Sequence, residues 1–132
     1  MTGVLLYIKE DQVDWVFENE DIGSGSPTFK GMAKEGNRVF VASKSGGELA
    51  VVGEIPVSKV YEEADHPRGL EFRVTANEGT SVRYAEPVSL ARVKDELSIL
   101  RGTSDIWRQI QYPRWLSPED AELISRLGRV PQ

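Results

Sequence analysis

The sequence lacks cysteine and contains a single histidine, His66, among its 132 residues. A chain without thiols forms no disulfide and offers no cysteine nucleophile or thiolate zinc site, and one histidine cannot build a His-rich metal cluster. No apolar run approaches the ~18 residues that would cross a bilayer, and the N-terminus lacks the basic start of a secretory signal. We therefore expect a cytoplasmic protein that needs no cofactor or metal and makes no membrane contact.

Positive charge is also scarce. The net charge is −5 at pH 7. Residues 1–66 carry six basic and twelve acidic side chains, whereas residues 67–132 carry ten basic and nine acidic ones, and nine of those ten bases are arginine. Nonspecific binding of nucleic acids depends on the neutralisation of many phosphates. The composition therefore excludes a protein that coats nucleic acid indiscriminately, but not a selective binder that uses a patch of the arginine-rich half.

What is present indicates one domain spanning residues 1–132, since 39% of the residues are hydrophobic and 28% are charged. Its clearest feature is a pair of apolar runs, residues 38–43 and 49–60, around Gly46 and Gly47. This pattern predicts two strands joined by a tight turn. An interior glycine and proline in the second run favour a bulge or a kink, so we expect that strand to curl like the wall of a small barrel.

The segments before this hairpin predict a strand, a helix and a loop. Residues 3–8 are continuously apolar, as in a buried strand. Acidic residues then open a helical stretch in which Trp15 lies off the apolar stripe. Residues 19–31 are rich in glycine and serine and predict an irregular loop of the kind that often has a function. The side chains of this loop that could meet a ligand are Thr28, Phe29 and Lys30.

The segments after the hairpin predict further strands and a closing helix. Residues 62–69, which contain His66, indicate a solvated polar turn, and residues 70–75 alternate so that Arg73 lies on the polar face of a strand. Residues 93–100 indicate a helical turn followed by a short strand. Ser117 then caps a helix that ends at Gly128. The order of elements predicts an α+β fold: a curved, mostly antiparallel β-barrel with a helix near each end.

Three stretches carry a resemblance to a known family. They are K-E-G-N-R-V-F-V over residues 34–41, L-S-I-L-R-G-T-S-D-I-W over residues 97–107, and the helix of residues 117–127. In this order they resemble the EVE domain family of the PUA-like superfamily, which also contains the YTH and ASCH domains. The resemblance spans nearly the whole chain. It departs from the family in having Gly36-Asn37 before the strand, where Gly-Asp is common, and no tryptophan in residues 19–31.

The resemblance implies a PUA-like barrel with a concave pocket that binds nucleic acid, especially modified bases. Such a pocket needs aromatic faces for stacking, polar groups for the base edge and cations for phosphate. In the similar YTH pattern, the turn that follows the first hairpin strand borders the ligand. The expected ligand-binding residues are Trp15, Thr28, Phe29, Lys30, Ser43, Lys44, Arg73, Trp107 and Arg108.

Most of these residues also have an ordinary structural interpretation. The tryptophans could pack against the barrel, Ser43 could belong to a simple hairpin turn, and Arg73 could form a salt bridge. We interpret Trp115, which lies just before the helix cap, as a hydrophobic staple.

Three functions remain open from the sequence. The first, which we expect, is a noncatalytic module that binds RNA, modified DNA or a nucleotide. The second is an ASCH-like hydrolase acting on a nucleoside or RNA, in which Lys44 would act with Glu48 or Glu54. The third is a module that binds a small molecule or a protein, which would suit the acidic N-terminal half.

Overall fold

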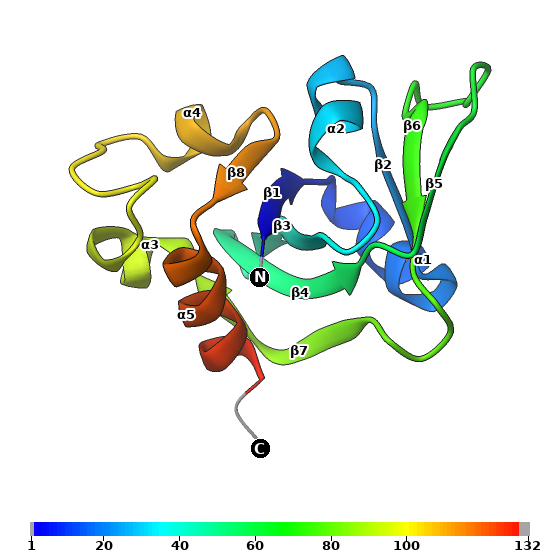
Figure 1. Ribbon diagram of the computed structural model, residues 1–132. Helices are drawn as coiled ribbons and strands as arrows, with labels where there is room; N and C mark the ends of the chain where they lie inside the picture. Colours follow the sequence, from blue (N-terminus) through cyan, green and yellow to red (C-terminus); the bar gives the residue numbers. More distant parts are fainter. Residues whose placement is uncertain (1, 130–132) are drawn as a thin grey trace.

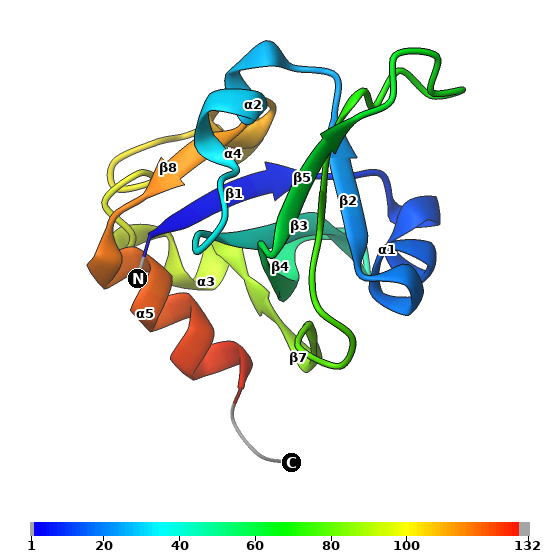
Figure 2. The same ribbon diagram turned by 45° about the vertical axis from the view of Figure 1, so that its right-hand side comes forward.

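Two sheets and a set of short helices form an α+β fold in the computed structural model, which describes residues 2–129 (Figures 1 and 2). The expected α+β class is therefore confirmed. The larger sheet has the spatial order β7 (Val82–Ser89), β4 (Glu48–Pro56), β3 (Arg38–Ser45), β1 (Gly3–Tyr7) and β8 (Arg114–Leu116). The smaller sheet has the order β2 (Asp21–Ser24), β6 (Phe72–Thr75) and β5 (Lys59–Glu62).

The helices occupy both sides of the larger sheet. The 3₁₀ turn η1 (Glu10–Gln12), α1 (Val13–Asn19) and α2 (Pro27–Met32) lie on the side of the smaller sheet (Figure 1). The opposite side carries α3 (Leu90–Val93), the 3₁₀ turn η2 (Lys94–Glu96), α4 (Ile106–Ile110) and α5 (Pro118–Gly128). No helix within residues 2–129 is long and apolar enough to cross a membrane.

The predicted hairpin is confirmed as β3 and β4. Gly46 and Gly47 have φ angles of 60° and 84°, the left-handed region that a two-residue turn needs and that glycine enters at least cost. The expected bulge is also present, because the pairing of β4 shifts register on both sides near Gly53. A Cβ on Gly53 would lie 2.4 Å from a backbone oxygen of β7. Glycine therefore allows the close strand approach that bends β4.

The larger sheet separates two hydrophobic clusters. Val4 and Leu6 of β1 belong to the cluster beneath α1, α2 and the smaller sheet, whereas Leu5 belongs to the cluster beneath α3, α4 and α5. Successive strand residues point to opposite faces, so a strand covered on both sides must be apolar at consecutive positions. This explains the continuous apolar run at the start of the chain. The β1–β3 pairing is parallel, and the other pairings described are antiparallel.

Several predicted elements differ from the observed ones. Residues 19–31 form β2 and α2 instead of an irregular loop, and residues 97–100 form a turn instead of a strand. The closing helix is confirmed, with the Ser117 hydroxyl accepting a hydrogen bond from the Asp120 N–H at 3.1 Å. Trp115 is not a staple, because it lies on the edge strand β8 and is 47% exposed. The neighbouring Leu116 is buried in its place.

Candidate functional site

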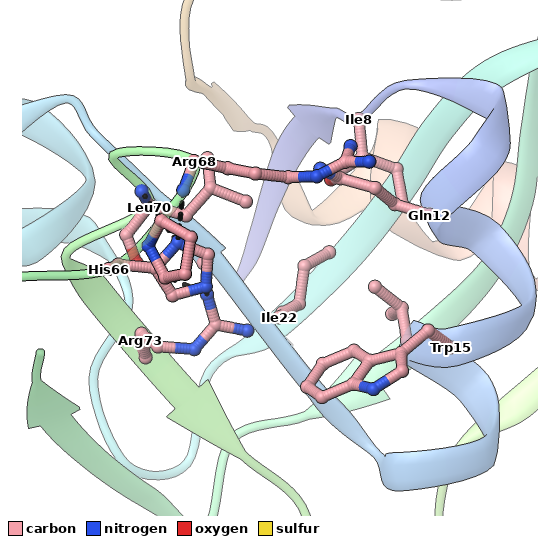
Figure 3. A pocket seen from close by; sticks show the side chains of 11 residues that line it. Ile8, Gln12, Trp15, Ile22, His66, Arg68, Leu70 and Arg73 are labelled. Carbon is pink, nitrogen blue, oxygen red and sulfur yellow. Dashed lines mark hydrogen bonds between the residues drawn. The ribbon is translucent and has the colours of Figure 1, made fainter.

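A cavity of about 290 Å³ lies between α1, the end of β1, β2 and the loop from β5 to β6 (Figure 3). We call it the Trp15 cavity. Its principal lining residues are Ile8, Gln12, Trp15, His66, Arg68 and Arg73.

Trp15 provides the exposed aromatic surface of this cavity. Val13 and Val16 of α1 are buried in the core. At about 100° per residue, Trp15 points roughly 160° away from Val13 and 100° away from Val16, so it lies off that apolar stripe. Its side chain is 49% exposed. The ring centroid lies 5.7 Å from the guanidinium carbon of Arg73, a cation–π distance. The indole is thus held at the cavity wall with part of its surface open to a ligand.

Arg73 is buried, and of its two structural interpretations the salt bridge is confirmed whereas the solvated strand face is not. It is only 3% exposed. Its Nη2 lies 3.0 Å from Asp21 Oδ1 and its Nε donates to Asp21 and to the Tyr61 hydroxyl, while Nη1 donates to the Leu70 carbonyl at 3.1 Å. The polar face of β6 is covered by α1 and the β5–β6 loop, so Arg73 is a paired cation of the cavity wall and not a free phosphate contact.

The position of Arg73 depends on a glycine in the neighbouring strand. Gly23 of β2 is the register partner of Arg73. A Cβ on Gly23 would lie 2.6 Å from Arg73 Nη1, closer than such atoms approach. The missing side chain therefore leaves the space through which the guanidinium crosses β2 to reach the cavity.

His66 forms another wall, although its segment was interpreted as a solvated turn. Its Nδ1 accepts hydrogen bonds from the backbone N–H groups of Arg68 and Leu70 at 3.1 and 3.3 Å. Its Nε2 lies 3.3 Å from Arg73 Nη1. The imidazole edge and the guanidinium therefore meet at one point of the wall, where they present polar groups to a ligand.

Arg68 spans the mouth of the cavity (Figure 3). Its two terminal nitrogens donate to the two carboxylate oxygens of Asp11 at 3.2 and 3.1 Å. This hydrogen bonding lowers the pKa of Asp11 and raises the pKa of Arg68. Both side chains are about half exposed or more, so the pair contributes little to stability and can exchange partners.

Two of the expected binding residues lie in the interior. Phe29 and Ser43 have no exposed surface. This corrects the assignment of Ser43 as a direct ligand contact, whereas Phe29 lies at the wall of a separate hollow of about 240 Å³ that Lys30 and Arg73 also line. Phe29 packs in the cluster beneath α2. The Ser43 hydroxyl donates to the Ile8 carbonyl at 2.9 Å, so it ties β3 to the end of β1 behind the cavity.

The remaining predicted residues lie apart from the Trp15 cavity. Thr28 and Lys30 are exposed on α2, where Lys30 pairs with Glu62, and Lys44 is exposed on the hairpin. Trp107 and Arg108 are exposed on α4. Of the nine residues predicted, the cavity is lined by Trp15 and Arg73.

The structure argues against Glu54 as a catalytic carboxylate of a hydrolase. Glu54 is fully buried and pairs with Arg38 and Arg129. In the hairpin register Glu54 lies opposite Phe40, whereas Lys44 lies opposite Leu49. Four residues of strand separate the two positions, which is roughly 13 Å. Lys44 and Glu54 therefore cannot act on one reacting bond.

Sequence reasoning missed Gln12, His66 and Arg68 as cavity residues. The one available signal was the singular histidine in H-P-R-G. The β5–β6 loop brings it to the cavity, because this loop lines the cavity together with residues of η1 and α1. The position of this loop depends on contacts between residues more than fifty positions apart, such as the Arg68–Asp11 pair. A local sequence pattern does not predict such contacts.

The fold has solved counterparts. A hypothetical protein from Leishmania major superposes with a TM-score of 0.66 at 12% identity, over 97% of this chain and 94% of that one. The NMR structure of Rpa0253 from Rhodopseudomonas palustris has a TM-score of 0.63 at 18% identity, over 97% and 93%. At these identities the likeness shows the fold alone. No family model matches the sequence, and no curated protein matches it significantly.

Proposed function

We propose that this chain is a noncatalytic EVE-like domain of the PUA-like type that binds nucleic acid by taking one base into the Trp15 cavity. The observation that carries the proposal is the meeting of an exposed indole with the polar side chains of His66 and Arg73 in one concavity. A base offers a flat ring to the indole and polar edge atoms to these side chains.

The size and construction of the cavity support this proposal. Its volume of about 290 Å³ is at the lower limit of ~300 Å³ for small-molecule sites, which suits a single ring system better than a large cofactor. The polar side chains that would meet the base edge are anchored, since Asp21 and Leu70 fix Arg73 and two backbone N–H groups fix His66. The packing of the smaller sheet over one face of the larger sheet supports the PUA-like barrel of this proposal. A modified base is the ligand that the resemblance to the EVE family implies.

The test is a binding screen by fluorescence anisotropy. Short single-stranded RNA and DNA oligonucleotides with unmodified or methylated bases are titrated with the protein at low salt. We expect Trp15→Ala to lower the affinity of the best ligand about tenfold or more, because stacking of one base on an aromatic ring is worth ~1–3 kcal/mol. Trp115→Ala removes a similarly exposed indole from the edge strand β8 and is the matched control.

Two results would contradict the proposal. One is a screen in which the wild-type chain binds no oligonucleotide at low salt. The other is an unchanged affinity in Trp15→Ala, which would show that the bound strand lies elsewhere.

A further inference from the structure

The Trp15 cavity continues into a second hollow. This hollow has a volume of about 360 Å³ and shares Ile8, Gln12, Gly23, Arg68 and Leu70 with the first. It also includes Tyr7, the last residue of β1, and Lys9. We call the two hollows together the β1 groove. Because the shared wall is extensive, a ligand in the first hollow can extend directly into the second.

Two aromatic side chains, Tyr7 and Trp107, lie in contact at the far end of the β1 groove. Tyr7 lines the second hollow and meets Trp107 of α4 edge to face, with ring centroids 4.7 Å apart and planes at 82°. This is a favourable aromatic geometry, so it fixes the orientation of the Trp107 ring. Trp107 is nevertheless 43% exposed. Trp15 thus lines one end of the groove, and the accessible Trp107 lies next to Tyr7, the lining residue at the other end.

Cations lie between the two indoles. Arg68 lines both hollows, and the exposed Lys9 lines the second. The guanidinium of Arg68 now binds the Asp11 carboxylate through two parallel hydrogen bonds. A phosphate group accepts the same two-pronged contact. Since the Arg68–Asp11 pair is exposed and weak, a phosphate held in the groove can replace Asp11.

We infer that the ligand of the β1 groove is a single nucleic-acid strand of at least two nucleotides and not a free nucleoside or mononucleotide. One base stacks at Trp15, the phosphodiester meets Arg68 and Lys9, and the neighbouring base stacks on Trp107. A duplex does not fit this arrangement, because both bases must leave the stack to expose their faces. The inference rests on the proposed function and specifies its ligand class.

The experiment compares a nucleoside, a mononucleotide and a dinucleotide that carry the same base. They are prepared in ribo and deoxy series for the four common bases and their singly methylated forms, and binding is measured by calorimetry. We expect the dinucleotide to bind wild-type protein at least tenfold more tightly than the mononucleotide, since a second stacked base adds ~1–3 kcal/mol. Trp107→Ala should remove that gain and leave mononucleotide binding unchanged. Trp115→Ala should change neither.

Two further variants test the phosphate contact. Arg68→Gln should weaken the dinucleotide and reduce the slope of log affinity against log salt by about one. Asp11→Asn frees Arg68 and should strengthen phosphate-bearing ligands without affecting nucleosides. Asp14→Asn is the matched control, because Asp14 is also an exposed η1–α1 carboxylate in an ion pair but its partner is Arg83. It should leave the affinities for phosphate-bearing ligands unchanged.

The outcomes separate the inference from the proposed function. If mononucleotide and dinucleotide bind wild-type protein equally well and Trp107→Ala binds both normally, the two-base groove is wrong while the base cavity stands. If no nucleoside, nucleotide or oligonucleotide binds, the proposed function itself is wrong. Should Trp107→Ala fail to fold, Trp107→Leu keeps the packing volume against Tyr7 but removes the stacking face, and the same loss of dinucleotide affinity is expected.

Discussion

Substitution of Glu54 by glutamine is expected to destabilise the protein in a way that depends on pH. Glu54 is fully buried on β4 beneath α5. Its carboxylate accepts hydrogen bonds from Arg38 and from the Tyr84 hydroxyl, and from Arg129 Nη2 at 2.7 Å. Glutamine keeps the shape of the side chain but removes the charge, so the two guanidinium groups lose their shared anion.

The magnitude follows from the pKa of Glu54. Burial alone would raise this pKa, but the hydrogen bonds from Arg129, Tyr84 and Arg38 outweigh burial and lower it from 4.5 to about 2. One pKa unit corresponds to about 1.4 kcal/mol, so the ionised group stabilises the fold by about 3 kcal/mol. Removal of one partner from a buried ion pair typically costs ~3–5 kcal/mol, which is consistent with this figure.

The sign of the pH dependence is fixed by the direction of the shift. The folded pKa lies below the unfolded value, so the contribution of Glu54 is complete above pH ~5 and is lost as the pH falls toward 2. Urea unfolding at a series of pH values measures the free energy of unfolding of both proteins. We expect a difference of about 3 kcal/mol between wild type and Glu54→Gln at pH 7, which shrinks steadily between pH 5 and 2. A difference that stays constant over this range would refute the reasoning. Tyr84→Phe, which removes one donor, should give a smaller effect of the same form.

The remaining predictions concern glycines and a helix cap. Gly53→Ala should destabilise by ~1–3 kcal/mol in urea unfolding, because its Cβ would clash with a β7 backbone oxygen 2.4 Å away; wild-type stability would show that β4 can unbend. Gly23→Ala should displace Arg73 and weaken base binding in the anisotropy assay, whereas Gly31→Ala, whose Cβ would meet nothing within 4 Å, should bind normally. Ser117→Ala should lower the free energy of unfolding by ~1 kcal/mol, and an unchanged value would mean that the helix needs no side-chain cap.

Local chemistry made the hairpin and the closing helix predictable. Both are specified by residues within a few positions of one another, namely Gly46-Gly47 between apolar runs and Ser117 before the helix. The turn requires left-handed φ angles and the helix requires a partner for its free N–H groups. These requirements are satisfied within the segment itself, so the sequence pattern identifies them.

The strand β2 illustrates what local pattern cannot show. Its sequence D-I-G-S has little strand character, and it forms because Asp21 to Ser24 pair with β6 about fifty residues later. The burial of Arg73 also depends on segments that are distant in the sequence. Alternation predicted its polar face, and a salt bridge was one interpretation of it. The helix and loop that bury this salt bridge come from residues 12–16 and 66–70, which the local pattern could not show.

By itself, the sequence determined the α+β class, the central hairpin with its bulge, the capped final helix and the position of Trp15 off the apolar stripe of α1. Each of these depends on neighbouring residues, where backbone geometry and side-chain period act directly. Only the tertiary structure decided that Trp15, His66 and Arg73 line one cavity, that Phe29 and Ser43 lie inside, and that a groove leads on toward Trp107. Those facts depend on which distant segments pack together, because the free energy of burial acts on the whole fold and not on any one segment.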